Sequence, residues 1–343
     1  MKNPENDEPI FIIGTERSGS NLLRLMLNAH SRIAIPHPPH IMRDFSPIVT
    51  LYGDLNNDAI FHRLVRDVVK VVEMHFSPWQ IKPEITQVMA RAPSRSLYGI
   101  YCALYEIHRE SVGKPRWGCK STFMYRHIDE IRQHHRKPRF LHLVRDPRDV
   151  AASADSSVFS KFHPYHVGLL WAKEQGEISS CFRSKEKNLI LTVRYEDLVS
   201  SPEATIARIM EFLGEEFEKS QMEYFRTQEA VSLARLSTSW KNCNSPISQN
   251  SVGRFKKDLK PEAVKWVELA AANMMAEFGY SPIHRSGKAE ITALKKLGLG
   301  ISENLRKIKV EFVAMSTDRN FLLRWKRTAF LAYLRFSLKV SRA

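Results

Sequence analysis

The sequence lacks several features that would each have assigned it to a class of protein. It has only four cysteines among 343 residues, Cys102, Cys119, Cys181 and Cys243, and none of them forms a CxxC pair. That spacing argues against a zinc site or a redox dithiol and favours reduced cysteines in a cytoplasmic protein. No run of about 18 apolar residues is present, and residues 1–9 are polar and acidic. We therefore expect neither a membrane-spanning helix nor a secretory signal.

A loop near the start of the chain lacks the lysine that its glycine spacing would suggest. An apolar run, Ile10–Ile13, leads into Gly14 and Gly19, which have the spacing of the phosphate-binding loop GxxxxGK[ST]. Ser20 and Asn21 stand where that loop has its lysine and its serine or threonine. The lysine and hydroxyl serve a triphosphate and its magnesium ion. We therefore expect a nucleotide ligand that is not ATP or GTP.

The same loop still has the groups that bind a phosphate. Its backbone N–H groups are expected at the start of a helix, where the helix dipole also favours an anion. The side chains of Arg17, Ser18, Ser20 and Asn21 add hydrogen-bond donors, and Arg17 can bind two oxygens of one anion. A plain turn between a strand and a helix is the alternative. The clustered donors directly after an apolar run favour a phosphate site.

Three strand-helix units predict an α/β fold. The predicted strands are 9–14, 139–144 and 188–193, and each precedes a helical segment. Apolar strands that alternate with helices are typical of a parallel sheet covered on both faces, so we expect a P-loop-like three-layer fold. The rest of the chain is predicted to be mostly helical over 45–137, helical over 163–183 and 262–278, and a polar loop over 237–260.

A second candidate anion site follows the middle predicted strand. Arg145 falls at the end of that strand, Pro147 suits the first turn of a helix, and Ser153 lies about two turns further on. Arg145 and Ser153 could share a second phosphate. In the alternative, Arg145 and Arg148 form surface ion pairs with the aspartates that follow them.

These segments together resemble the sulfotransferases that use 3′-phosphoadenosine 5′-phosphosulfate (PAPS). The resemblance covers most of residues 9–283 and is nearest to the tyrosylprotein and bacterial carbohydrate-type branches. Its four motifs are Arg17–Arg24, Leu143–Ser153, Tyr195–Leu198 and Ser251–Leu259. The donor has a single phosphate esterified to sulfate, which accounts for the missing lysine.

The resemblance implies roles for particular residues. Gly14 to Asn21 would hold the 5′-phosphosulfate, and Arg145 with Ser153 would hold the 3′-phosphate. Tyr195 would lie near the nucleotide. Gly253, Arg254 and Lys256 would belong to a loop that closes over it. The family transfers the sulfuryl group directly from donor to acceptor without a required metal.

The resemblance also points to the catalytic residues. Lys120, within Trp117–Thr122, is the candidate for stabilising the charge on the leaving phosphate, and Arg17 would share that work. Many relatives place a glutamate base where this chain has Pro38. His37 and His40 flank that position, and imidazole titrates near neutral pH, so either could accept the proton; we favour His40.

Glu16 is a weaker candidate for the base, because we expect it to point away from the anion. The acceptor would be a small molecule, a carbohydrate or a lipid. Much of its pocket is predicted within residues 45–115, although the aromatic and histidine side chains there suit a core equally well. These side chains are Tyr52, Phe61, His75, Trp79 and Tyr98.

Two other functions fit parts of the sequence. Pro38 makes a non-catalytic nucleotide- or glycan-binding protein on the same scaffold an alternative, and a divergent P-loop kinase is the other. Nucleic-acid binding is not expected, because the body has no basic stripe with interleaved aromatic residues.

The last part of the chain lies outside the resemblance, so we expect a domain of residues 1–283 and a basic helical extension, 284–343. The extension contains 14 Lys/Arg and 4 Asp/Glu, and supplies +10 of the net charge of +15. Residues 321–342 predict an amphipathic helix with Arg324, Arg327, Arg335, Lys339 and Arg342 on one face. Such a helix suits peripheral contact with a membrane, docking on the protein's own core, or an interface between subunits of a homo-oligomer.

Overall fold

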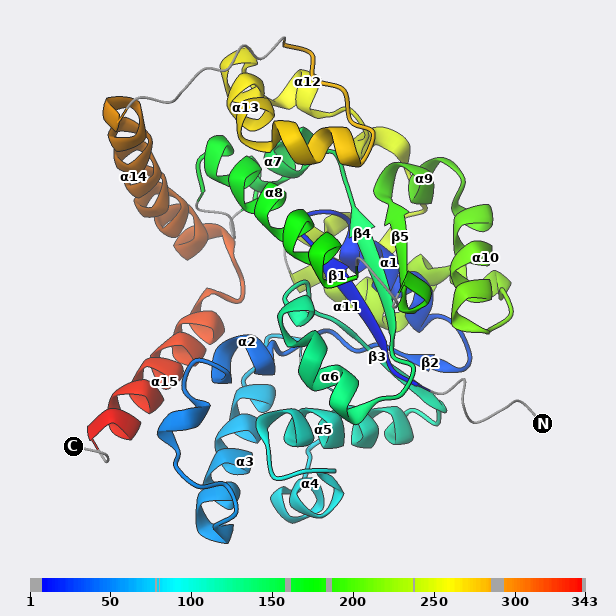
Figure 1. Cartoon of the computed structure of the whole chain (residues 1–343), viewed down its shortest axis with the longest axis vertical. Coiled ribbons are helices and arrows are strands. Elements are labelled where there is room, and N and C mark those ends of the chain that lie inside the picture. Colours follow the sequence, from blue (N-terminus) through cyan, green and yellow to red (C-terminus); the bar gives the residue numbers. More distant parts are fainter. Residues whose placement is uncertain are drawn as a thin grey trace.

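A computed structural model describes most of the chain. The described residues are 8–77, 79, 81–157, 162–182, 187–236, 238–284 and 293–340. At their centre is one parallel sheet with the strand order β2-β3-β1-β4-β5 (Figure 1). The strands are β1 (Ile10–Gly14), β2 (Ile33–Ala34), β3 (Arg116–Lys120), β4 (Arg139–Val144) and β5 (Ile190–Arg194). The prediction of an α/β fold with a central parallel sheet is confirmed.

The central strand β1 shows why helices cover both faces of the sheet. All of its residues are buried, and successive side chains point to opposite faces. Phe11 and Ile13 pack into one hydrophobic core, whereas Ile10 and Ile12 pack into another. A strand that is apolar on both faces requires a helical layer on each side, which produces the three layers.

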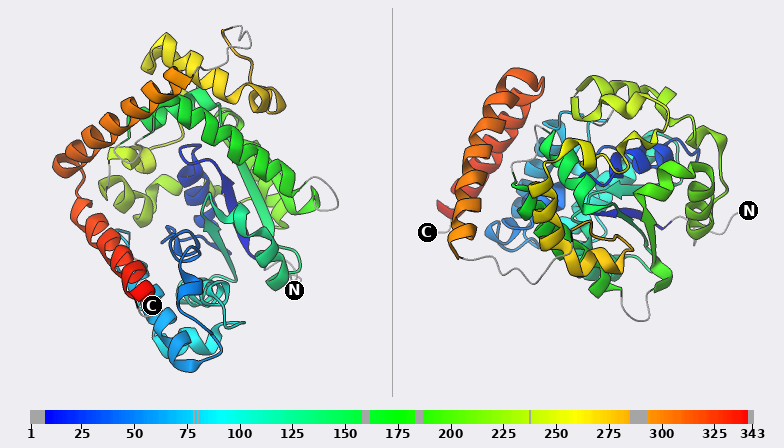
Figure 2. Two further views of the ribbon diagram at one scale, coloured as in Figure 1. Left: turned by 60° about the vertical axis from the view of Figure 1, so that its left-hand side comes forward. Right: turned by 90° about the horizontal axis from the view of Figure 1, so that it is seen from above.

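The helices divide between these layers (Figures 1 and 2). The core around Phe11 is closed by α2 (Ile41–Phe45), α3 (Asp58–Glu73), α4 (Ile85–Arg91), α5 (Leu97–Ser111) and α6 (Ile128–His134). The core around Ile10 is closed by α1 (Ser20–Asn28), α9 (Tyr195–Ser200), α10 (Pro202–Leu213) and α11 (Gln228–Leu236). A third core joins α7 (Pro147–Asp155), α8 (Pro164–Cys181), α12 (Phe255–Asp258) and α13 (Pro261–Glu277).

The last two helices lie along one side of the molecule (Figures 1 and 2). They are α14 (Ala293–Thr317) and α15 (Phe321–Val340). Leu331, Leu334 and Leu338 of α15 are buried in the same core as Phe11. Within the described residues, no helix is long and apolar enough to cross a bilayer.

The predicted strand-helix units correspond to β1, β4 and β5 with the helices that follow them, but β2 and β3 were not predicted. The sequence of β3 begins with Arg116 and ends with Lys120, so it has no apolar run. Arg116 is nevertheless buried, because its guanidinium donates hydrogen bonds to the carbonyl oxygens of Glu8 and Leu213.

The prediction of a polar loop over 237–260 was also partly wrong. That region contains helical turns at Thr238–Asn244 and Gln249–Ser251, as well as α12.

Candidate active site

The predicted site residues gather because every strand of the sheet ends at the same edge. Parallel strands place their carboxyl ends together, and ligands of such sheets bind beyond that edge. The candidate residues lie at or after these ends: Lys120 is the last residue of β3, and the loop Gly14–Asn21 starts at the last residue of β1. His37 and His40 follow β2, Arg145 follows β4 and Tyr195 follows β5. Residues that are up to 181 positions apart in the sequence thereby share one site.

The loop after β1 has the backbone geometry of an anion-binding turn. Arg17 has a φ of 71° and Gly19 a φ of 91°, both in the left-handed region, and α1 begins at the next residue, Ser20. A left-handed non-glycine residue is a strained conformation that is concentrated at functional sites. The side-chain Oγ of Ser18 is buried and has no hydrogen-bond partner among the described residues.

Gly19 is required by packing as well as by conformation. A Cβ atom at this position would lie 2.3 Å from the ring of Tyr195. The loop therefore rests directly on the tyrosine after β5. This contact joins two of the four motifs.

Arg145 joins the remaining motifs. Its guanidinium donates hydrogen bonds to the carbonyl oxygen of Arg17 over 3.0 Å and to that of Ser251 over 2.6 Å. It also lies over the Tyr195 ring, 4.4 Å from the centroid. Arg17 in turn donates through Nε to Ser153 Oγ over 3.2 Å. The loop after β1 and the motif after β4 are thus in direct contact.

The segment predicted to close over the nucleotide is anchored to α7. The backbone N–H groups of Gly253 and Phe255 both donate to the carboxylate of Asp149, at 2.7 and 2.9 Å. Arg254 pairs with Asp258 and reaches Ser156, directly after α7. Lys256 is exposed on α12, outside the set of side chains that line the cavity described next.

A cavity of about 480 Å³ opens at this edge of the sheet. Its walls come from the loop after β1, from both predicted histidines, and from Lys120, Arg145 and Ser153. Glu16, which was expected to point away, also lines it. Six of the residues predicted to bind the donor line the cavity beside those predicted for chemistry: Arg17, Gly19, Ser20, Asn21, Arg145 and Ser153. Gly14, Ser18, Tyr195, Gly253 and Arg254 are not among its lining residues.

Lys120 lies at the carboxyl end of β3, inside this cavity. Burial lowers the pKa of its ammonium group to about 8, and the positive charge of Arg24 adds to the effect. Its proton is therefore held less tightly than that of a solvated lysine, which favours donation toward a developing negative charge.

His37 and His40 form another part of the cavity wall. Burial lowers the pKa of both His37 and His40 well below the usual value, so both are neutral at pH 7. Neither ring nitrogen of His37, nor Nδ1 of His40, has a hydrogen-bond partner among the described residues. His40 also has a left-handed backbone, with a φ of 58°. Neutral imidazoles with unpaired nitrogens can accept a proton.

Five side chains within residues 45–115 were considered for the acceptor pocket, and of these only His75 lines this cavity. Burial lowers its pKa to about 4, and its ring lies 5.0 Å from that of His37. The other four, Tyr52, Phe61, Trp79 and Tyr98, belong to the hydrophobic core. Trp79 has a supporting role, because its indole N–H donates to the carbonyl oxygen of His37 over 2.9 Å.

Other cavity residues were not predicted at all. Arg324, Arg327 and Thr328 of α15 line the cavity, as do Trp240 and Cys243. Arg327 donates to the carbonyl oxygen of Pro39 and pairs with Asp44, which fixes α15 against the segment that holds the histidines. Arg327 is 288 and 283 residues from these two partners, so the local sequence gives no signal of such a role.

Comparison with known proteins agrees with this geometry. A model described as the sulfotransferase family matches residues 9–219, which is more than half of the chain. The chain belongs to the sulfotransferase family. Its general activity is therefore the transfer of a sulfuryl group. No curated protein matches the sequence.

Solved structures of sulfotransferases have the same fold. The sulfotransferase domain of the Synechococcus PCC 7002 olefin synthase matches with a TM-score of 0.56 and 21% identity, over 82% of this chain and 97% of that one. The sulfotransferase domain from the curacin biosynthetic pathway matches with a TM-score of 0.54 and 18% identity, over 80% and 98% of the two chains.

Proposed function

We propose that this sulfotransferase moves the sulfuryl group of PAPS to a hydroxyl group on a carbohydrate, a lipid or another small molecule. The observation that carries the proposal is the contact between its two anion-binding elements. Arg17 donates to Ser153, and Arg145 donates to the carbonyl oxygen of Arg17. A nucleotide with one anionic group at its 5′ position and another at its 3′ position suits two such elements that meet in one cavity.

Unsatisfied buried donors in the two anion-binding elements fit these anions. The hydroxyl of Ser18 and Nε of Arg145 are buried without hydrogen-bond partners among the described residues. Leaving such donors unpaired costs free energy, and phosphate or sulfate oxygens would accept their hydrogen bonds. In this proposal the loop after β1 binds the 5′-phosphosulfate, while Arg145 and Ser153 bind the 3′-phosphate. Tyr195 supports Gly19 and the Arg145 guanidinium.

The chemistry requires a base and a stabilised leaving group. We assign the base to His40, with His37 beside it: an imidazole nitrogen takes the proton from the acceptor hydroxyl. The acceptor oxygen forms a bond to sulfur as the bond between sulfur and the bridging phosphate oxygen breaks. Lys120 and Arg17 stabilise the negative charge that develops on that oxygen, which remains with the nucleotide. These side chains supply the positive charge, so the proposal includes no metal ion.

The decisive experiment is a transfer assay with radiolabelled PAPS and a panel of saccharides, glycolipids, phenols and peptides. We expect label to appear on one acceptor class, and 3′-phosphoadenosine 5′-phosphate (PAP) to bind the protein in calorimetry. Binding of PAP without transfer to any acceptor would instead support a non-catalytic binding protein. Magnesium-dependent binding of ATP in place of PAP would support a divergent kinase.

A further inference from the structure

The side of α15 that faces away from the body is apolar. We call Leu322, Trp325, Tyr333, Phe336 and Val340 the outer stripe. Their spacing of three, four, seven or eight residues places them on one face of the helix. Their exposed fractions lie between 58% and 69%, although large apolar residues are usually buried.

The orientation of α15 is fixed by its opposite face. Leu331, Leu334 and Leu338 are between 1% and 8% exposed and pack into the core with β1 and α3. Arg327 is paired with Asp44 on the same side of the helix. The outer stripe is therefore the exposed face of a docked helix, and a contiguous apolar surface of this kind marks an interaction site.

The charges around the outer stripe indicate what covers it. Between Phe321 and Val340 the helix has five Lys/Arg and no acidic residue. Lys326, Arg335 and Lys339 are exposed beside the stripe. An apolar stripe flanked by lysine and arginine is the pattern of helices that lie in the interface of an anionic bilayer.

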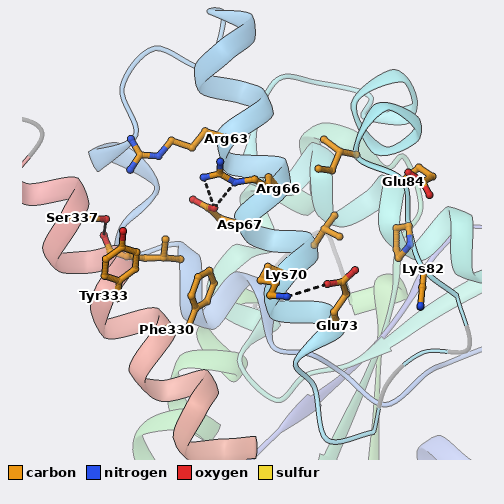
Figure 3. Close-up of a pocket in the computed structure, with 14 residues that line it drawn as sticks. Arg63, Arg66, Asp67, Lys70, Glu73, Lys82, Glu84, Phe330, Tyr333 and Ser337 are labelled. Atoms are coloured by element: carbon orange, nitrogen blue, oxygen red, sulfur yellow. Dashed lines mark hydrogen bonds and ion pairs between the residues drawn. The ribbon is translucent and has the colours of Figure 1, made fainter.

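A groove along one edge of the stripe adds further basic groups. It has a volume of about 500 Å³ and separates Phe330 and Tyr333 of α15 from α3 (Figure 3). Arg63, Arg66, Lys70 and Lys82 line it together with Asp67, Glu73 and Glu84. Asp67 pairs with Arg66 and Glu73 with Lys70. Arg63 lies over the Tyr52 ring, 5.9 Å from its centroid. With four basic and three acidic residues, the groove has a small excess of positive charge at the edge of the stripe.

The helix that carries the outer stripe also lines the active-site cavity, through Arg324, Arg327 and Thr328. A helix with its side chains is about 10 Å across. A surface in contact with the outer stripe would therefore lie about one helix diameter from the cavity wall.

We propose that the outer stripe docks this protein onto anionic lipid bilayers and so presents the active site to acceptors carried in the membrane. The docking depends on the surface of α15 and the adjoining groove, and not on the proposed sulfuryl transfer. The choice of membrane-borne acceptors rests in addition on the proposed sulfuryl transfer, and the two parts are tested separately.

The docking is tested by co-sedimentation of the full chain with vesicles in 0.15 M salt. One set contains phosphatidylcholine alone and the other contains about a quarter phosphatidylglycerol. We expect at least about tenfold tighter binding to the anionic vesicles. The triple variant Leu322→Ser, Trp325→Ser, Phe336→Ser should lose about tenfold or more of that binding. The charge variant Lys326→Glu, Lys339→Glu should lose the preference for the anionic set.

The matched control is Val112→Ser with Leu169→Ser, two large apolar residues that are each 41% exposed, one directly after α5 and the other on α8. It should bind vesicles like the unchanged protein. PAP binding by calorimetry shows that each variant is folded and tests the donor site independently of the lipid.

Equal binding to both vesicle sets, or full binding by the triple variant, would overturn the proposal. So would a dimer in sedimentation equilibrium that becomes a monomer in the triple variant, because a second copy would then cover the stripe. If vesicles bind but no membrane-borne acceptor is sulfated, the docking stands and the acceptor assignment fails.

Discussion

At the scale of single residues, burial lowers the pKa of both the lysine and the histidines of the cavity, with different consequences for their chemistry. It lowers the pKa of Lys120, which makes the proton of a charged group easier to donate. It also lowers the pKa of His37 and His40, which keeps them neutral and able to accept a proton. These protonation states suit the proposed mechanism, in which Lys120 stabilises the leaving oxygen and a neutral imidazole takes the proton of the acceptor hydroxyl.

Replacement of Lys120 should remove transition-state stabilisation and leave donor binding largely intact. We expect Lys120→Ala to lower kcat/KM about 100-fold or more, with PAP binding changed only a few-fold in calorimetry. The rate of the unchanged enzyme should also fall as the pH rises through about 8, since Lys120 loses its proton there. Lys120→Arg keeps the charge at higher pH and should move this decline upward. An unmoved decline in that variant would show that Lys120 does not cause it.

The histidine base makes a separate prediction. His40→Ala should lower kcat about 100-fold, and the double variant with His37→Ala should be lower still, while PAP binds as before. Because the histidine pKa values lie well below 6.5, the enzyme should keep its kcat/KM at pH 6. His62→Ala, an exposed histidine on α3, is the control and should be unaffected. Full activity of the double variant would exclude a histidine base.

At the scale of elements, the turn between β1 and α1 packs against Tyr195, the first residue of α9. Gly19 combines a left-handed backbone with a close approach to the Tyr195 ring. Gly113, between α5 and β3, is also left-handed, with a φ of 67°, but a Cβ there would meet no atom within 4 Å. These two glycines therefore separate the effect of conformation from the effect of packing.

We expect Gly19→Ala to weaken PAP binding by about tenfold or more, because the new methyl group must displace Tyr195 or the loop. Gly113→Ala incurs the same kind of backbone strain without a collision, so it should lower the melting temperature slightly and leave PAP binding unchanged. Calorimetric titration of both variants tests this. Equal PAP affinities would mean that the contact with Tyr195 does not shape the donor site.

The elements also show what the sequence could predict and why. The loop after β1 and the motif after β4 follow apolar strands and carry their own donors, so local pattern was sufficient to find them. The strand β3 was not predicted, because Arg116 and Lys120 at its two ends leave no apolar run in its sequence. The cavity residues Arg324 and Arg327 were not predicted, because their position depends on how α15 packs. Arg327 fixes that packing through its contacts with Pro39 and Asp44, which are distant in the sequence.

At the scale of the whole molecule, α15 is attached to the part of the chain that the sulfotransferase family shares. Its leucines pack in the same core as Phe11 of the central strand and Val68 of α3. The sequence predicted a boundary at residue 284, on the basis of charge and of the end of the resemblance. A hydrophobic core that crosses such a boundary favours cooperative unfolding of both sides.

We therefore expect one thermal unfolding transition, and a substitution in α15 should move all of it. Leu334 is 3% exposed, and Leu334→Ala should lower the free energy of unfolding by about 2–4 kcal/mol, with a drop of several degrees in the melting temperature. Leu322→Ala, at a leucine of the same helix that is 69% exposed, should change it by less than about 0.5 kcal/mol. Differential scanning calorimetry with and without PAP distinguishes the outcomes. If Leu334→Ala shifts only an early, PAP-independent transition, residues 284–343 unfold as a separate unit, and α15 cannot hold the cavity wall in place once that unit has melted.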